Sequence, residues 1–188
     1  PGGTNTITGV YGAWVDSIAM LVISGQVKWE TTVRSTGLSL RQYGDQELDI
    51  EEIVRPVTKY CFMVTDPLSI RYHLEKAMYL ATSGRPGPVW LDIPLNVQAS
   101  QIEPDQLTGF DPVELNEPWK DTDLNKASSE ILEKITQAKR PVVLAGGGVR
   151  LSGQHQAFIQ LVEKLGVPVV TGWNAHDVIW NAHPNYVG

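Results

Sequence analysis

The segment ATSGRPGPVWLDIP, residues 81–94, contains the pattern on which the fold prediction rests. Its first residues end a helix predicted to begin at Pro67, after the cap Asp66, and to stop at Gly84. The apolar residues of this helix, from Ile70 to Ala81, recur every three or four positions and so share one face. The glycines and prolines then turn the chain, and Val89 to Pro94 is a short apolar run typical of a buried strand. A helix, a turn and a buried strand in this order predict an α/β fold.

The same alternation of apolar runs and amphipathic helices extends along all 188 residues. Met20–Ser24 is a continuous apolar run, which predicts a strand covered on both faces. We therefore expect three-layer α/β/α domains built on parallel sheets. The pattern forms two partial units, residues 1–98 and 123–188, joined by a Pro-rich acidic linker at 99–122. The second unit has two evident strands and no obvious further strand to close its sheet.

Composition and charge exclude several classes of protein. The formal net charge is -6, and the Lys and Arg residues are scattered, which argues against nucleic acid and against an acidic membrane surface as partners. No apolar stretch approaches the roughly 20 residues of a membrane span. The single cysteine, Cys61, is expected to be a small buried side chain. The four histidines show no metal-ligand spacing, and His73 and His155 are expected to be exposed. We expect a cytoplasmic metabolic protein.

Two segments carry candidate chemistry. AGGGVRLSG at 145–153 follows a predicted strand and precedes a helix, so its backbone N–H groups could hold a diphosphate; a tight turn is the plainer alternative. The next strand ends without a carboxylate, which disfavours a nicotinamide cofactor. GDQELD at 44–49 ends a long polar loop at 25–46, and its acidic side chains suit the start of a helix. Within it, Gln46 is a neutral donor and acceptor that can orient a polar substrate.

In this order, these segments resemble the thiamine-diphosphate-dependent enzymes of the acetolactate synthase type. The resemblance rests on PGGTN before a helix, DSIAMLVISGQV, the Asp-Gln-Glu segment, IVRPVTKY, ATSGRPGPVWLDIPLNV and KRPVVLAGGG. It covers essentially all of this chain but only part of such a family chain. It implies that residues 1–98 are the C-terminal part of the pyrimidine-binding domain, and that 123–188 begin the central, FAD- or nucleotide-binding-like domain.

The resemblance also implies site residues and cofactors. Gln46 matches a glutamine that projects toward the substrate, and it is the catalytic candidate. The expected cofactors are thiamine diphosphate with Mg²⁺, and FAD is a further one that the family allows. No metal ligand is expected in this chain: the Gly-Asp-Gly…Asn segment that holds Mg²⁺ is expected beyond Gly188, and the catalytic glutamate upstream of Pro1. The cofactor-binding candidates are Pro1, Gly2 and Asn5 at the pyrimidine ring, and Arg55, Gly146, Gly147 and Gly148 along FAD.

The activity implied is decarboxylation of a 2-keto acid with transfer or release of the acyl unit, by a homodimer or homotetramer. The isolated chain is predicted to be inactive because both ends of the cofactor must be fixed. Asp45 stands where true acetolactate synthases carry an apolar aromatic residue, and Thr65 where a lysine is usual. These differences leave the substrate open. A non-catalytic nucleotide-binding or assembly module of the same fold is the alternative, and a nicotinamide-dependent oxidoreductase is less favoured.

Overall fold

The computed structural model describes residues 2–115 and 123–188. Contacts divide the chain into two compact units, Pro1–Leu115 and Asn116–Gly188, each with its own sheet and core. Unit 1 begins with a 3-10 turn at Gly3–Thr6. Its helices and strands are α1 (Ile7–Asp16), β1 (Met20–Gln26), α2 (Val33–Thr36), α3 (Ile50–Val54), β2 (Tyr60–Met63), α4 (Ile70–Thr82), β3 (Pro88–Pro94) and α5 (Leu95–Gln98).

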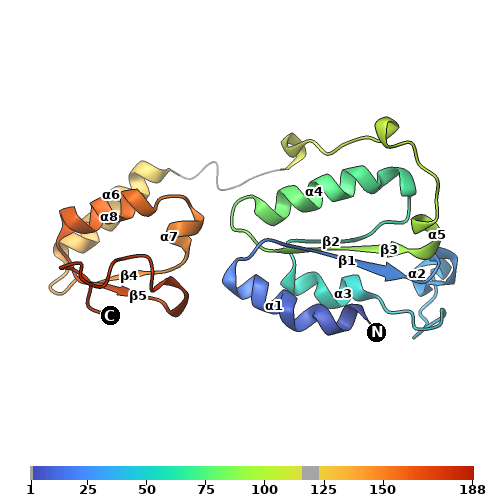
Figure 1. The fold of residues 1–188 in the computed structure, drawn as a ribbon, viewed down its shortest axis with the longest axis horizontal. Helices are drawn as coiled ribbons and strands as arrows, with labels where there is room; N and C mark the ends of the chain where they lie inside the picture. The colour runs from blue at the N-terminus through green and yellow to red at the C-terminus, as the bar shows by residue number, and fades with distance from the viewer. Residues whose placement is uncertain (1, 116–122) are drawn as a thin grey trace. The chain divides into compact units, whose positions relative to one another are not determined.

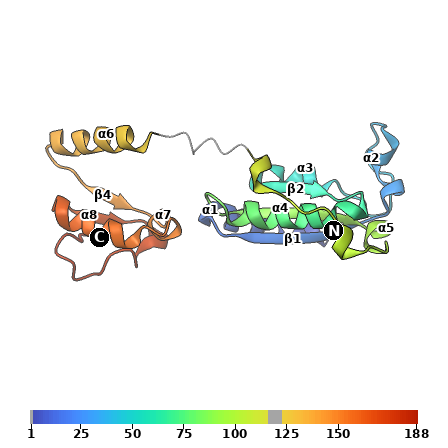
Figure 2. The same cartoon turned by 90° about the horizontal axis from the view of Figure 1, so that it is seen from above.

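The sheet of unit 1 has three parallel strands in the order β1-β3-β2. Helix α4 covers one face of this sheet, and α1 and α3 cover the other (Figures 1 and 2). The predicted α/β fold with parallel strands is therefore confirmed. Because all three strands run the same way, their carboxyl ends meet at one edge, where α5 and the loop after β1 lie.

The core of unit 1 is organised by the central strand β3. Trp90 and Leu91 are fully buried, and they face opposite sides of the sheet because side chains alternate along a strand. Leu91 packs in the cluster beneath α4 that contains Ala77 and Ala81, whereas Trp90 packs in the cluster that contains Val10 of α1. Full burial of such a side chain contributes roughly 1.5–3 kcal/mol. The segment that predicted the fold therefore lies at its centre.

Three sequence predictions about exposure are wrong. Strand β1 is not fully covered on both faces, since the side chain of Ile23 is 55% exposed. His73 is buried: its ring stacks on Phe62 with centroids 4.0 Å apart, and its Nδ1 lies 2.6 Å from the hydroxyl of Tyr60. His155 is half-buried, with its Nε2 2.7 Å from the carbonyl oxygen of Val178. Cys61 is buried, as predicted.

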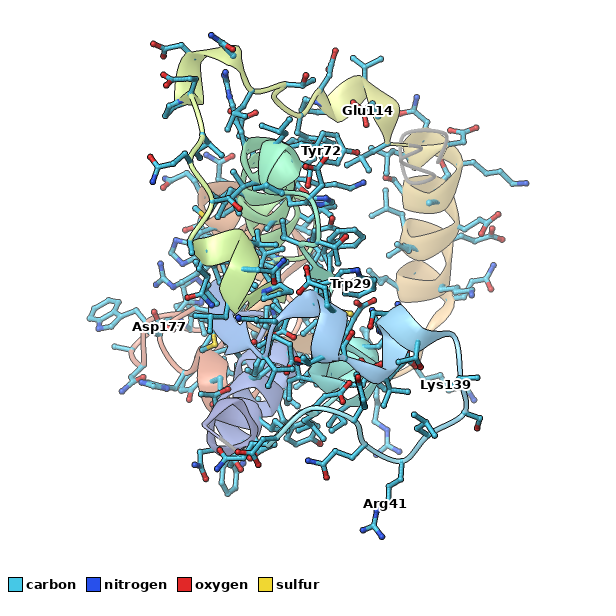
Figure 3. All side chains as sticks on the ribbon, turned by 90° about the vertical axis from the view of Figure 1, so that its right-hand side faces the viewer. Trp29, Arg41, Tyr72, Glu114, Lys139 and Asp177 are labelled. Atoms are coloured by element: carbon cyan, nitrogen blue, oxygen red, sulfur yellow. The ribbon has the colours of Figure 1, made fainter. Side chains whose placement is uncertain are left out.

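The predicted linker is structured where the structure describes it. Residues 99–115 lie along α4: the backbone N–H of Phe110 donates to Glu75 at 2.8 Å, and the Phe110 ring meets Tyr72 edge to face. The Tyr72 hydroxyl donates to Glu114 at 2.8 Å, a pair visible at the top of Figure 3. Up to Leu115, the segment belongs to the packing of unit 1.

Unit 2 has a smaller sheet, in which β4 and β5 pair in parallel. Its core contains Ala145 of β4, Val162 of α8 and Val169 of β5. As expected, no further strand closes this sheet among the described residues, although Val169 and Tyr186 form an isolated parallel bridge. Backbone hydrogen bonds there join Val169 to Asn185 and Val187, and Thr171 to Gly188. The elements are α6 (Leu124–Gln137), β4 (Val143–Ala145), α7 (Gly148–Leu151), α8 (His155–Leu165) and β5 (Val169–Thr171).

Helix α6 begins at Leu124, and Asp123 caps it by accepting backbone N–H groups from Asn125 and Lys126. Its apolar stripe matches the sequence prediction, but none of its side chains is buried, and Ile131 is 57% exposed. No helix among the described residues is long and apolar enough to cross a membrane.

Candidate functional site

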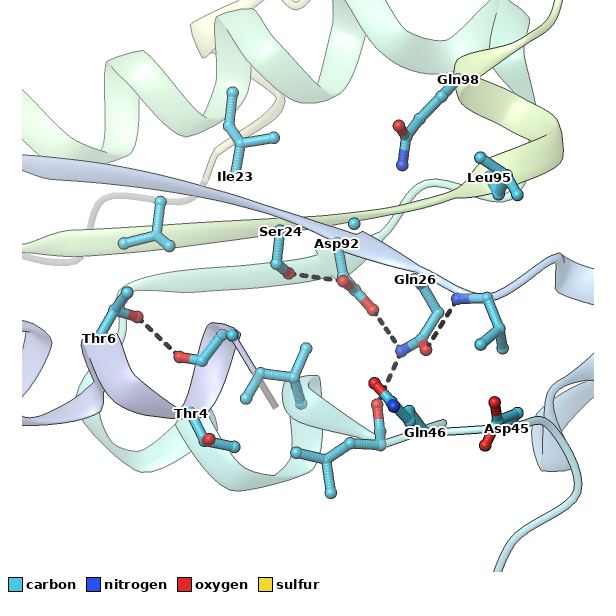
Figure 4. Close-up of a pocket in the computed structure, with 17 residues that line it drawn as sticks. Thr4, Thr6, Ile23, Ser24, Gln26, Asp45, Gln46, Asp92, Leu95 and Gln98 are labelled. Carbon is cyan, nitrogen blue, oxygen red and sulfur yellow. Dashed lines mark hydrogen bonds between the residues drawn. The ribbon is translucent and has the colours of Figure 1, made fainter.

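A cleft of about 750 Å³ lies at the carboxyl ends of β1 and β3 (Figure 4). This edge is where parallel α/β sheets usually place their ligands, because the loops after the strands diverge there. Four sequence segments meet in it: the N-terminal turn, the end of β1, the polar loop that leads into α3, and the end of β3 with α5. The lining residues are Gly2, Gly3, Thr4, Thr6, Val22, Ile23, Ser24, Gly25, Gln26, Val27, Asp45, Gln46, Leu48, Ile50, Asp92, Leu95 and Gln98.

One wall of the cleft is a buried hydrogen-bond network around Asp92, which is 1% exposed. Ser24 Oγ donates to Asp92 Oδ1 at 2.5 Å, and Gln26 Nε2 donates to Asp92 Oδ2 at 2.9 Å. Ser24 Oγ also accepts from Trp90 Nε1 at 2.8 Å. Burial raises the pKa of the Asp92 carboxyl, and the bonds from Ser24 and Gln26 only partly oppose that rise.

Gln46 lies on the opposite wall, in an unusual backbone conformation. Its φ angle is 58°, in the left-handed region that costs a non-glycine residue roughly 1–3 kcal/mol. Such strain persists only when the surrounding structure holds it, and it is concentrated at functional sites. Figure 4 shows Gln46 and Asp45 next to one another on the same loop. The predicted catalytic residue therefore lines the cleft in a strained conformation.

Glu47 organises the loop that carries Gln46. Its Oε1 accepts the backbone N–H of Val33 at 2.5 Å, and its Oε2 accepts those of Tyr43 and Gly44 at 3.0 Å. Burial opposes ionisation, but these three bonds outweigh it, so the pKa of the Glu47 carboxyl lies below its usual value. Glu47, the residue after Gln46, is thus held as a carboxylate that binds the backbone on both sides of the loop.

An ion-pair cluster fixes the two ends of this loop together. Arg34 of α2 binds both oxygens of Asp49, at 2.8 and 3.0 Å, and also binds Glu51 at 2.8 Å. Asp49 caps α3 by accepting the backbone N–H of Glu52. Asp49 therefore starts a helix, as the acidic segment predicts, and Asp49 and Glu51 also pair with the guanidinium of Arg34 at the other end of the loop.

The N-terminal candidates lie near the cleft to different degrees. Gly2 lines it, and a Cβ built on Gly2 meets no described atom within 4 Å, so the backbone there leaves open space. Asn5 is exposed and does not line the cleft, although its neighbours Thr4 and Thr6 do. Pro1 lies outside the described residues. Gly2 and Gln46, 44 positions apart in sequence, are the two predicted site residues that the fold brings to one cleft.

The remaining candidates lie elsewhere. Arg55 does not line the cleft; its Nη2 donates to Glu51 and Glu52, both at 2.7 Å. Gly146 and Gly147 lie in unit 2 between β4 and α7, and Gly148 is the first residue of α7. A Cβ on Gly146 or Gly148 meets nothing within 4 Å. Gly148 lines a separate hollow of about 430 Å³ with Phe158 and other α8 residues. The binding roles of all four residues stay predictions.

The structure adds Ser24, Gln26 and Asp92, which sequence reasoning missed. A signal was present: each is a polar residue inside an otherwise apolar strand. Ser24 and Gln26 are two positions apart on β1, so they share one face, and Asp92 pairs with Ser24 in the parallel register. That register depends on contacts across 68 positions of sequence, so the three residues could not be grouped from the sequence alone.

The chemistry of the cleft suits a ring with amino groups better than it suits a diphosphate. Its lining includes two carboxylates, Asp45 and Asp92, and no Lys or Arg side chain among the described residues. A diphosphate would find no cation on these walls, whereas a flat, neutral or protonated ring with amino groups meets acceptors and open backbone at Gly2. Among residues 2–115 and 123–188, no group of three or more His, Cys, Asp or Glu is placed to hold a metal ion.

Comparison with known proteins agrees with this geometry. Residues 1–53, which include the N-terminal turn, β1 and Gln46, match the profile "Thiamine pyrophosphate enzyme, N-terminal TPP binding domain". Residues 128–188 match "Thiamine pyrophosphate enzyme, central domain". This chain belongs to the thiamine pyrophosphate enzyme family. The resemblance to this family drawn from the sequence is therefore confirmed.

Similar proteins in this family carry two kinds of name. The acetolactate synthase large subunit of Corynebacterium glutamicum is 37% identical over 193 residues, covering 100% of this chain and 28% of the relative. That of Lactococcus lactis is 35% identical, covering 91% of this chain and 28% of the relative. The glyoxylate carboligase of Escherichia coli O157:H7 is 36% identical, covering 92% of this chain and 28% of the relative. The chain thus spans less than a third of the length of these relatives.

Proposed function

We propose that this chain supplies the pyrimidine-binding part of a thiamine-diphosphate-dependent carboligase or decarboxylase that acts on a 2-keto acid. The observation that carries the proposal is the meeting of Gly2 and strained Gln46 in one cleft. The relatives named acetolactate synthase and glyoxylate carboligase support a carboligase. Residues 1–98 then form the end of the pyrimidine-binding domain, residues 99–122 a connection, and residues 123–188 the start of the central domain.

The residues have distinct roles in this proposal. When bound, thiamine diphosphate supplies a thiazolium carbon acid that adds to the keto carbon and stabilises the acyl unit after loss of carbon dioxide. Gly2 leaves its backbone open to the pyrimidine ring, and Gln46 orients the polar groups of the substrate by donating or accepting a hydrogen bond. Asp45 adds a carboxylate beside Gln46, which would select among 2-keto acids by charge and shape.

The other cofactors and partners belong to the same proposal. Mg²⁺ and the diphosphate would be held by residues outside this chain. FAD would contact Gly146–Gly148 of unit 2, and absorbance near 450 nm in the purified protein would support its presence. The active assembly would be a cytoplasmic homodimer or homotetramer, and the isolated chain would have no turnover.

A graft tests the function directly. The homologous segment of the Corynebacterium glutamicum acetolactate synthase large subunit is replaced by this chain, and consumption of 2-keto acids is measured with and without thiamine diphosphate. The graft should turn over a 2-keto acid only with the cofactor, and Gln46→Ala should lower kcat about 100-fold, as loss of a well-placed polar group does. A graft that folds and binds the cofactor yet consumes no 2-keto acid would refute the proposal and favour a non-catalytic module.

A further inference from the structure

A chain of hydrogen bonds runs from the centre of the sheet to the loop that carries Gln46. It begins at Trp90 and Ser24 and passes through Asp92 to the side chain of Gln26. Gln26 Nε2 then donates a second bond, 2.7 Å long, to the backbone carbonyl oxygen of Leu48. Figure 4 shows Gln26 between Asp92 on the sheet and the loop of Gln46.

The amide of Gln26 uses both of its donor hydrogens and its acceptor oxygen in this position. One Nε2 hydrogen serves Asp92 and the other serves Leu48, while Oε1 accepts the backbone N–H of Val27 at 3.1 Å. No other side-chain type of this size can donate twice and accept once in the same plane. The position therefore requires a glutamine, and its two donated bonds tie a loop backbone to a buried strand.

The hydrogen bond from Gln26 reaches the loop at Leu48, two residues after Gln46. The side chain of Gln46 itself is exposed. On this side of Gln46, the bond from Gln26 to Leu48 joins the loop to β1 and β3, whereas Glu47 binds backbone groups from within the loop region itself. The strained backbone of Gln46 needs such external support, because a free loop would relax to φ < 0.

We propose that Gln26 is a positioning residue, which fixes Gln46 in the cleft by tying the carbonyl of Leu48 to the buried carboxylate of Asp92. The inference deepens the proposed function and rests on it, since Gln46 matters as the group that faces the substrate. Gln26 itself touches neither substrate nor cofactor in this role. It determines whether the Gln46 loop keeps one conformation.

Two variants remove the tie in different ways. Gln26→Glu replaces the double donor by a carboxylate, which faces both Asp92 and the Leu48 carbonyl with like partial charge. Gln26→Met keeps the length and removes all hydrogen bonding, so it is the milder change if the first variant fails to fold. Gln106→Glu is the matched control, because Gln106 is exposed on the same unit and away from the cleft.

The measurement is amide hydrogen–deuterium exchange of the full 188-residue chain, resolved over residues 43–49 and over α4. Both variants should speed exchange at residues 43–49 about tenfold, whereas α4 should change little and Gln106→Glu should behave like the unsubstituted chain. Unchanged exchange at residues 43–49 in folded Gln26→Met, or an equal rise throughout unit 1, would overturn the proposal.

A double variant separates positioning from general stability. When Gln26→Glu is combined with Asp92→Asn, the amide introduced on β3 can donate to the carboxylate introduced on β1, so the strand-to-strand bond forms again with reversed polarity. The thermal midpoint should therefore recover toward that of the unsubstituted chain, while exchange at residues 43–49 stays fast because Leu48 still lacks a donor. Recovery of loop protection together with the midpoint would contradict the proposal.

These outcomes are independent of those that test the function. Thiamine binding and turnover in the graft test the function, and exchange in the unliganded chain tests the tie. If the Gln26 variants exchange fast at residues 43–49 but the graft has no turnover, the proposed function is wrong and the positioning role of Gln26 is supported. If the graft has turnover but exchange at residues 43–49 is unchanged in the Gln26 variants, the proposed function is supported and the positioning role is wrong.

Discussion

Ser24 donates a 2.5 Å hydrogen bond to Asp92 across neighbouring parallel strands, at the register position where the two residues pair. The Asp92 side chain is 1% exposed, and it lines the wall of the cleft. Gln26 satisfies the second oxygen of the same carboxylate. A buried charge with both oxygens bonded is tolerated, and removal of either donor leaves one oxygen unpaired.

The raised pKa of Asp92 predicts a pH dependence of stability. In the folded state the carboxyl holds its proton to higher pH than in the unfolded state, so its contribution to the free energy of unfolding falls as pH rises from about 4 through the folded pKa. Asp92→Asn removes this titration. Urea unfolding from pH 4 to 8 should therefore show the unsubstituted protein losing stability, relative to the variant, as pH rises. A relative gain in stability with rising pH would contradict this.

The lowered pKa of Glu47 predicts the opposite dependence. Its contribution is present above the unfolded pKa of about 4.3 and is lost as pH falls through the folded pKa. Glu47→Gln weakens the bonds to Tyr43 and Gly44 and should cost about 1–2 kcal/mol at pH 7. The cost should shrink in urea unfolding at about pH 3, where Glu47 in the parent protein is losing its charge. A cost that is the same at both pH values would show that the carboxylate charge is unimportant.

Backbone strain at Gln46 predicts that function and stability conflict there. Gln46→Gly should raise the free energy of unfolding by about 1 kcal/mol, because glycine adopts φ near 58° without a Cβ penalty. Gln46→Ala should give no such gain, since alanine retains the Cβ. Both variants should lower kcat in the graft. Equal stability of the Gly and Ala variants would show that the left-handed conformation carries no strain.

Gly44 is required by close approach rather than by its φ angle. A Cβ at this position would lie 2.6 Å from the carbonyl oxygen of Thr31 and 3.0 Å from Val27, so Gly44→Ala should cost about 1–3 kcal/mol and displace the Gln46 loop. Gly12→Ala is the matched control: it lies in α1, meets nothing within 4 Å, and should stabilise by roughly 0.5–1 kcal/mol. Thermal unfolding of the two variants should move in opposite directions.

Much of the fold follows from local sequence signals. The acidic residues at 44–49 predict the start of a helix, and α3 begins directly after them at Ile50 with Asp49 as its cap. The run ending at Pro94 forms the central strand, and its Val, Trp, Leu and Ile residues favour that environment, whereas Asp92 and Pro94 do not. Caps, turns and apolar runs therefore predicted where these elements lie, although the apolar run of β1 did not predict the exposure of Ile23.

The rest depends on contacts between distant residues, which no local pattern reports. His73 was expected to be exposed, but Tyr60 and Phe62 cover it from a strand that precedes it by more than ten positions. Gln46 has a φ angle of 58°, and the next two residues, Glu47 and Leu48, bind Val33 and Gln26 from distant parts of the chain. The sequence resemblance named Gln46 and Gly2, and the fold supplied Ser24, Gln26 and Asp92 around them.

The central claim is that the cleft between Gly2 and Gln46 takes the pyrimidine end of the cofactor. The most direct test is titration of the isotopically labelled chain with thiamine, which carries the ring without the diphosphate, followed by amide chemical shifts in NMR spectra. Saturable shifts should appear at Gly2, Thr6, Gln26 and Gln46, with residues 146–148 unchanged. Shifts confined to unit 2, or none up to the solubility limit of thiamine, would contradict the claim.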